Sequence, residues 1–194
     1  MAIRVYITGA AGAGVSTLGR ALAAHYGLAL LDTDAYFWEA TDPPFTTKRP
    51  ADQRCALIAQ DQARAEAARG WVLCGSADGW GDAVIDGAQL IVYLYTPTPI
   101  RLARLRRREH DRHGARIAPD GDMALIYSKF LKWAASYDDP YFSGRSYGRH
   151  QEWLSGQTVA VLRLEGTTPP AQLLDAVQQA LQAPTHAWAG PQGG

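Results

Sequence analysis

Short runs of hydrophobic residues alternate with longer helical segments along this chain. Five of these runs are continuous rather than interrupted by polar residues, at positions 3–8, 28–32, 71–75, 90–95 and 159–164. Continuous runs are typical of strands that are covered on both faces, as in parallel sheets. We therefore predict an α/β protein with a five-stranded parallel sheet.

The segments between these strands have the composition and spacing of helices. We expect helices at 16–26, 51–69, 99–108, 122–136 and 169–182, of which the first two are rich in Ala and the third is rich in Arg. Strands that alternate with helices in this way predict a three-layer fold, with helices on both faces of the sheet.

Two connections are longer than a compact α/β unit needs. One has three prolines within residues 41–50, and the other spans 109–121. Loops of this length are often substrate loops or lids. We expect one domain over residues 1–182, with an acceptor loop at roughly 35–54 and an Arg-rich lid at roughly 104–121. Residues 183–194 are rich in Pro and Gly without periodicity, so a flexible tail is expected there.

Charge and cysteine content narrow the class of protein. The 194 residues include 19 basic and 19 acidic side chains, a formal net charge of zero, which argues against attachment to nucleic acid or a membrane by bulk charge. Cys55 and Cys74 have no metal-ligand spacing and fit a reducing compartment. Arg4 lies where the apolar stretch of a signal peptide would have to be. No run approaches the 18 apolar residues expected of a transmembrane helix. We expect a cytoplasmic monomer or weak homodimer.

The strongest local signal lies between the first predicted strand and the first predicted helix, from Thr8 to Thr17. There the chain reads TGAAGAGVST. Gly9 and Gly14 have the spacing of G-x-x-x-x-G-K-[ST], a motif whose backbone N–H groups surround a phosphate at a helix N-terminus. We expect the phosphates of a nucleotide to be bound by Gly9, Gly12, Ala13, Gly14, Val15, Ser16 and Thr17.

Val15 departs from this motif, because it occupies the position of the lysine. That lysine normally neutralises charge that develops between the β- and γ-phosphates, and valine cannot do so. The sequence therefore supports nucleotide binding more strongly than catalysis. As a hypothesis, a cation from another segment replaces the lysine, and the candidates are Lys48, Arg49 and an arginine of the lid.

Two carboxylates, Asp32 and Asp34, directly follow the second predicted strand. The carboxyl ends of parallel strands meet at one edge of a sheet, so these residues should face the same crevice as the phosphate loop. Ser16 and Asp32 are candidate Mg²⁺ ligands, and Asp34 is a candidate to accept the proton of a substrate hydroxyl. The alternative is that an Asp here only caps the next helix.

Seven of the 16 arginines lie within residues 101–116. Guanidinium groups recognise phosphate oxygens with two parallel hydrogen bonds, which suits a lid over a triphosphate. Arg101, Arg104 and Arg108 share one helix face by their spacing. The candidates for catalytic contacts from the lid are Arg108, Arg112 and Arg116. The alternatives are an exposed helix without a ligand, or RNA binding, which the neutral net charge disfavours.

Together these motifs resemble the adenylate kinase/shikimate kinase branch of P-loop small-molecule kinases. The resemblance also includes Cys74-Gly75-Ser76 after the third strand and Glu165-Gly166-Thr167 after the fifth, and it extends to about residue 182. It implies a P-loop NTPase fold that transfers phosphoryl groups from ATP, with Mg²⁺, to a nucleoside, a nucleotide or a hydroxylated metabolite. It also implies that Gly166 and Thr167 lie near the adenine. The Asp-x-Asp is closer to the shikimate and gluconate kinase pattern.

The acceptor is expected to lie near the acidic pair, the acceptor loop and the third strand. Many aromatic residues in this part of the chain allow a base or another flat ring to stack, although core packing is an equal alternative. The expected acceptor-binding residues are Asp34, Trp38, Arg49, Arg54, Ser76 and Arg145.

Two other functions remain open. A nucleotide-binding sensor or pseudo-kinase would have lost turnover together with the lysine. A Rossmann oxidoreductase would bind NAD(P) at Gly9, Gly12 and Gly14, with Asp32 near the ribose. The spacing disfavours it, because a G-x-G-x-x-G motif that begins at Gly12 needs a glycine where Thr17 stands.

Overall fold

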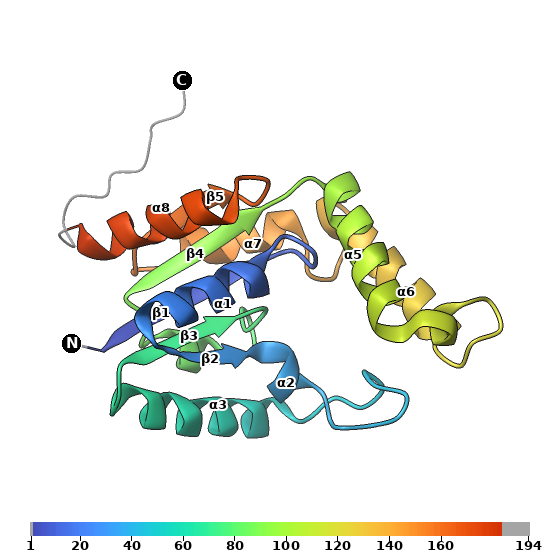
Figure 1. Cartoon of the computed structure of the whole chain (residues 1–194), viewed down its shortest axis with the longest axis horizontal. Coiled ribbons are helices and arrows are strands. Elements are labelled where there is room, and N and C mark those ends of the chain that lie inside the picture. The colour runs from blue at the N-terminus through green and yellow to red at the C-terminus, as the bar shows by residue number, and fades with distance from the viewer. Residues whose placement is uncertain (1, 184–194) are drawn as a thin grey trace.

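A computed structural model of the protein, which describes residues 2–183, contains one five-stranded parallel sheet in the order β2-β3-β1-β4-β5 (Figure 1). Each strand begins and ends within two residues of its expected bounds, so the predicted sheet is confirmed. The expected flexible tail lies, apart from Ala183, outside the described residues. The strands are β1 (Ile3–Gly9), β2 (Ala29–Asp32), β3 (Gly70–Cys74), β4 (Leu90–Tyr95) and β5 (Val161–Glu165).

Helices cover both faces of this sheet, which confirms the three-layer fold. In β1, Val5 and Ile7 pack with one layer of helices, and Tyr6 packs with the other. This double burial explains why the strands are continuously hydrophobic. No helix among the described residues has the length and hydrophobicity needed to span a bilayer. One layer contains α1 (Val15–Tyr26) and α8 (Pro170–Gln182), and the other contains α3 (Ala51–Glu66), α4 (Asp82–Ile85) and α7 (Tyr147–Ser155).

The strand order defines where a ligand can bind. Strand β1 is central. Strands β2 and β3 lie on one side of it, and the later strands β4 and β5 lie on the other. Open α/β sheets bind ligands outside the carboxyl ends of the strands, at the point where the order reverses. The order also differs from the 3-2-1-4-5 arrangement of the Rossmann fold, so the fold does not support the oxidoreductase alternative.

A helical hairpin, α5 (Thr98–His113) and α6 (Ala124–Ala135), projects beyond the sheet (Figure 1). Helix α5 ends five residues later than expected, and the short 3-10 helix η1 (Gly114–Ile117) follows it. The prediction of one long irregular connection from residue 109 was therefore wrong. Glu109 lies 4.0 Å from the guanidinium of Arg112, three positions along the helix, and ion pairs at this spacing stabilise a helix. It also lies 2.7 Å from the guanidinium of the adjacent Arg108.

Three short helices were not expected from the sequence: α2 (Thr33–Phe37), α4 and α7. Two of them begin at side-chain caps. Asp32 accepts a hydrogen bond from the backbone N–H of Asp34, and Ser146 accepts one from that of Arg149. Helix α7 matters for the site, because it begins two residues after Arg145.

Arg101 anchors the hairpin to the domain. Its side chain is completely buried, and Nε donates to the Thr96 carbonyl over 3.0 Å. Nη1 donates to the carbonyls of Ala11 and Ala134, each over 3.2 Å. One guanidinium thus joins the segment after β4, the phosphate loop and α6. Its charge is balanced by Asp138, 3.8 Å away. Arg101 therefore does not share the ligand-facing position that its spacing with Arg104 and Arg108 suggested.

Candidate functional site

A cavity of about 1800 Å³ lies between the phosphate loop, the acceptor loop and the α5–α6 hairpin (residues 98–135). It brings together most of the residues singled out from the sequence, although Arg49, Arg54 and Arg116 do not line it. Those that line it are Gly9, Gly12, Ala13, Gly14, Val15, Ser16, Thr17, Asp32, Asp34, Trp38, Ser76, Arg108, Arg112, Arg145, Gly166 and Thr167.

The phosphate loop is shaped to receive an anion. Gly12 and Gly14 adopt positive φ angles of 82° and 107°, which L side chains rarely adopt. At Gly9, a Cβ atom would lie 2.4 Å from the Leu94 carbonyl oxygen. Within residues 2–183, the backbone N–H groups of Gly12, Gly14, Val15 and Ser16 have no hydrogen-bond acceptor. Free N–H groups at a helix N-terminus fit the phosphates of a nucleotide.

Val15 is directed partly into the hydrophobic core. It is 8 % exposed and belongs to the cluster that includes Leu18 and Leu94. Its Cγ2 atom lies 3.2 Å from the position that a Cβ on Gly9 would occupy. The side chain at the lysine position therefore packs against the first residue of the loop and carries no charge.

The acidic pair lies beside the phosphate loop. Ser16 Oγ lies 3.5 Å from Asp32 Oδ2, and the pair fits a magnesium ion that completes its shell with phosphate oxygens and water. A metal site made by protein ligands alone is not indicated, because no three His, Cys, Asp or Glu side chains cluster within the described part of the chain.

Asp34 faces the cavity from α2. Burial and the neighbouring Asp32 carboxylate raise the pKa of Asp34, while the charges of Arg145, Arg108 and Arg112 act in the opposite direction. Three guanidinium groups therefore act on the carboxylate that could accept a proton. Two of them come from α5, and the third comes from the segment before α7.

Arg104 occupies a position that the sequence did not assign. Both of its Nη atoms donate to the Gly166 carbonyl over 3.0 Å. Its Nη1 atom also lies 3.5 Å from the carbonyls of Gly12 and Ala13. Arg104 therefore joins α5 to the phosphate loop and to the segment after β5, where the adenine is expected.

A buried polar cluster beneath the phosphate loop was also missed. His150 Nε2 lies 3.3 Å from both Thr8 Oγ1 and Asp78 Oδ1, and Nδ1 lies 2.6 Å from the Tyr137 hydroxyl. Burial lowers the pKa of His150 and outweighs the hydrogen bond to Asp78. Burial raises the pKa of Asp78, but the hydrogen bond to His150 and the charge of Arg145 hold it below its ordinary value.

One sequence signal could have revealed part of this cluster. Asp78 follows Cys74-Gly75-Ser76 at the carboxyl end of β3, where ligand-facing side chains gather. No local pattern in the sequence pointed to His150.

Arg145 extends from the segment before α7 to the start of the phosphate loop. Its Nη2 atom donates to the Gly9 carbonyl over 2.7 Å and to Thr8 Oγ1 over 3.2 Å. Asp78 Oδ1 lies 3.8 Å from the same nitrogen. The Nε atom is buried and has no hydrogen-bond partner among the described residues.

Two basic residues expected in the acceptor site stabilise the acceptor loop instead. Arg49 donates to the carbonyls of Ala35 and Tyr36, and its Nε lies 3.7 Å from Glu39. Arg54 is buried, donates to the Arg49 carbonyl over 2.6 Å and stacks 3.7 Å above the ring centre of Phe37. Both guanidinium groups are committed to the protein, which explains why neither lines the cavity.

Arg116 was expected to contact the phosphates, but it lies outside the cavity. Its guanidinium pairs with Asp42 of the acceptor loop and with Asp122 before α6. It thus connects the hairpin to the acceptor loop. Trp38 and Lys48 form an isolated antiparallel bridge in that loop, and both line the cavity.

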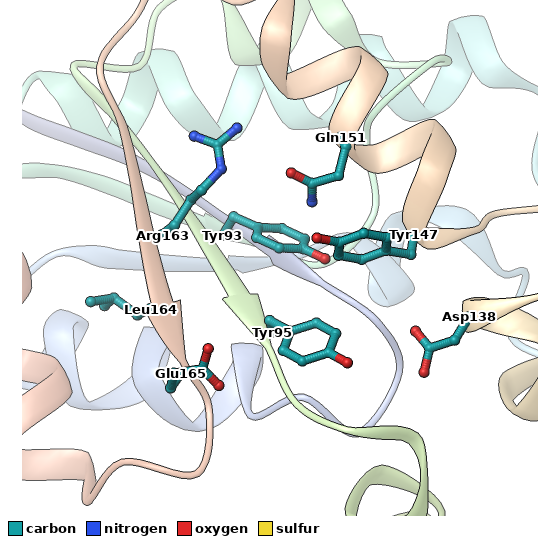
Figure 2. A pocket seen from close by; sticks show the side chains of 8 residues that line it. All are labelled: Tyr93, Tyr95, Asp138, Tyr147, Gln151, Arg163, Leu164 and Glu165. Carbon is teal, nitrogen blue, oxygen red and sulfur yellow. The ribbon is translucent and has the colours of Figure 1, made fainter. Parts of the chain in front are cut away.

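A second, smaller cavity of about 530 Å³ lies at the β5 edge of the sheet (Figure 2). Its walls come from β4, β5, α7 and η2 (Ser136–Asp138), and none of its residues lines the larger cavity. The phosphate loop and the acidic pair belong to the larger one. The smaller cavity is lined by Tyr93, Tyr95, Asp138, Tyr147, Gln151, Arg163, Leu164 and Glu165.

Comparisons with known families agree with this geometry. The family described as AAA domain (AAA_18) matches residues 5–123, which include the phosphate loop, the acidic pair and α5. The uncharacterized protein YqaC of Bacillus subtilis (strain 168) is 36 % identical over 173 residues, which cover 89 % of this chain and 94 % of that protein.

Solved structures of kinases share the fold. A shikimate kinase from Bacteroides thetaiotaomicron has a TM-score of 0.57 at 16 % identity, and the match covers 93 % of this chain and 99 % of that one. An unliganded sugar kinase from Janibacter sp. HTCC2649 has a TM-score of 0.54 at 16 % identity, covering 93 % and 95 %. A shikimate kinase from Acinetobacter baumannii, solved with shikimate, has a TM-score of 0.52 at 19 % identity, covering 94 % and 92 %.

Proposed function

Because this chain belongs to the AAA domain family and has the fold of P-loop small-molecule kinases, we propose that it transfers the γ-phosphoryl group of ATP to a small acceptor. The acceptor is a nucleoside, a nucleotide or a hydroxylated metabolite. One observation carries the proposal: the free N–H groups of the phosphate loop and the Asp34 carboxylate line a single cavity.

Different residues of the cavity would bind the nucleotide and transfer the proton. The free N–H groups of Gly12, Gly14, Val15 and Ser16 bind the phosphates, and Gly166 and Thr167 adjoin the adenine. Asp34 orients the acceptor hydroxyl and accepts its proton. Ser16 and Asp32 would hold Mg²⁺, which supplies positive charge between the phosphates. Arg108 and Arg112 face the same cavity from α5 and add positive charge near the transferred group.

The acceptor side of the cavity combines aromatic and polar groups. Phe37, Trp38 and Trp80 line it together with Ser76. Aromatic faces bind flat or cyclic ligands by stacking, and the hydroxyl group gives them an orientation. This combination supports a ring-containing acceptor that carries a hydroxyl group.

A turnover assay tests the proposal. The purified protein is incubated with ATP, Mg²⁺ and a panel of nucleosides, nucleoside monophosphates and sugar acids, and ADP is measured. We expect at least one acceptor to raise ADP production above the acceptor-free rate. Val15 favours the alternative of a nucleotide-binding sensor without turnover, which predicts that ATP raises Tm while no acceptor stimulates ADP release.

We further infer that the protein acts in the cytoplasm as a monomer or a weak homodimer. The neutral net charge and the two unpaired cysteines, Cys55 and Cys74, support this assignment. Sedimentation at several protein concentrations measures the oligomeric state, and a stable higher oligomer would contradict the inference.

A further inference from the structure

The cation that replaces the missing lysine of the phosphate loop can be identified from the contacts around Gly9. Val15 reaches Gly9 with a hydrocarbon side chain from the start of α1. Arg145 reaches the same residue from the segment before α7 and donates to its carbonyl oxygen over 2.7 Å. A positive charge is therefore present at the first residue of the loop, although α1 does not provide it.

Arg145 is held in place before any nucleotide binds. Its side chain is only 17 % exposed, and Thr8 and Asp78 fix the Nη2 atom. The buried Nε atom lacks a partner among the described residues. A guanidinium that is already oriented stabilises developing negative charge without first having to reorganise.

The other candidate cations have different partners. Arg49 is bound to backbone carbonyls and Glu39, outside the cavity. Lys48 lies 5.7 Å from the ring centre of Phe37. Arg104 donates with both terminal nitrogens to Gly166 and reaches the phosphate loop only at the carbonyls of Gly12 and Ala13, over 3.5 Å. Arg108 pairs with Glu109 over 2.7 Å. None of these contacts places a charge at Gly9.

We propose that Arg145 takes the place of the absent P-loop lysine and stabilises the charge between the β- and γ-phosphates. This inference rests on the proposed function. During transfer, a bond forms between the acceptor oxygen and the γ-phosphorus, and the bond to the β,γ-bridging oxygen breaks. The acceptor proton moves to Asp34, and the electron pair of the broken bond remains on the β-phosphate of ADP. The guanidinium of Arg145 faces that developing charge.

A pair of variants tests this substitution directly. Arg145→Met removes the charge, and the expected result is a fall in kcat of about 10²- to 10³-fold. Adding Val15→Lys to Arg145→Met returns a cation to the ordinary motif position. We expect kcat of this double variant to be at least tenfold higher than that of Arg145→Met. A purely structural role of Arg145 would not be rescued from α1. Arg163→Met, at an exposed position of β5, controls for the loss of an arginine elsewhere.

A measurement of nucleotide affinity tests the role of Arg145 independently of the proposed function, because binding can be measured without turnover. Calorimetry measures two affinities of the protein: one for a non-hydrolysable ATP analogue in the presence of Mg²⁺, and one for AMP. We expect Arg145→Met to weaken binding of the analogue at least tenfold and to leave the affinity for AMP nearly unchanged. Adding Val15→Lys should restore the affinity for the analogue. If wild type lacks transferase activity but shows this pattern, the proposed function fails and the role of Arg145 stands.

Two results would overturn the role of Arg145. One is an analogue affinity and kcat in Arg145→Met equal to those of wild type. The other is a folded double variant in which Val15→Lys restores neither quantity. Circular dichroism and Tm establish that the variants fold. Should Arg145→Met unfold, Arg145→Gln provides the same test, because its amide keeps a hydrogen-bond donor in the side chain without a charge.

Discussion

Arg116, at the tip of the α5–α6 hairpin, pairs with the carboxylate of Asp42, 74 positions earlier in the chain. The same guanidinium donates to Asp122 next to α6. Two segments that enclose the cavity from opposite sides, the hairpin and the acceptor loop, are therefore connected by one surface arginine. Because the contact is exposed, it should influence the mobility of these segments more than global stability.

We expect Arg116→Ala to loosen the acceptor loop without lowering Tm. Hydrogen exchange followed by mass spectrometry should show faster amide exchange in residues 40–47, and kcat/KM for the acceptor should decrease. Arg107→Ala is a matched control, because Arg107 is exposed on α5. Its Nε atom lies 3.9 Å from Asp111 Oδ2, so its ion pair stays within one helix. Identical exchange in the two variants would contradict a connecting role for Arg116.

The Asp34 carboxylate provides the most direct test of chemistry. We expect Asp34→Asn to lower kcat by about 10²- to 10⁴-fold, because the amide cannot accept the acceptor proton. The Kd for nucleotide should stay near that of wild type, since the phosphates are bound by the loop. Asp86→Asn, at an exposed carboxylate after α4, serves as the control. A parallel loss of kcat and nucleotide affinity would assign Asp34 to metal binding or to structure.

The sheet and the phosphate loop were predictable because their signals are local. A continuous hydrophobic run is sufficient for a doubly covered strand, and the spacing of Gly9 and Gly14 is sufficient for the loop between β1 and α1. The length of α5 was not predictable from hydrophobicity. Its last turns are held by the charged side chains around Glu109 rather than by an apolar face.

Contacts between distant segments explain the other differences. Nothing near Arg101 in the sequence shows that the carbonyls of Ala11 and Ala134 will surround it. The pair formed by Thr8 and His150 joins residues 142 positions apart, and only the crossover to α7 brings them together. Topology, rather than local pattern, therefore decides which arginine is structural and which faces the ligand.

Arg101 should be the most important arginine for stability. Its removal leaves the carboxylate of Asp138 without its partner and several carbonyls without their donor. We expect Arg101→Met to lower the free energy of unfolding by about 1–3 kcal/mol, because the buried carbonyls that accept from Arg101 lose their donor. In Arg106→Met, on the exposed face of α5, the change should stay within about 0.5 kcal/mol. Urea denaturation measures both, and equal midpoints would contradict the anchoring role.

The buried His150 predicts a pH dependence of stability. Asp78, Arg145, Tyr137 and Thr8 surround its ring nitrogens, and burial lowers the pKa of His150 below the value of about 6.5 expected in the unfolded chain. The unfolded state therefore binds more protons as the pH falls through this range. The stabilising contribution is complete above about pH 6.5 and is lost as the pH decreases toward the folded pKa.

We therefore expect the urea midpoint of the wild type to decrease between pH 7.5 and pH 5.5. His150→Gln has no titrating ring, so its midpoint should lie lower at pH 7.5 and change less across the same interval. Asp78 does not interfere, because its lowered pKa moves its own loss of stability to below about pH 4. His110→Gln, at an exposed position of α5, controls for the removal of a histidine. A wild-type midpoint that rises toward pH 5.5, or an equal slope in His150→Gln, would show that this histidine is already charged in the folded protein.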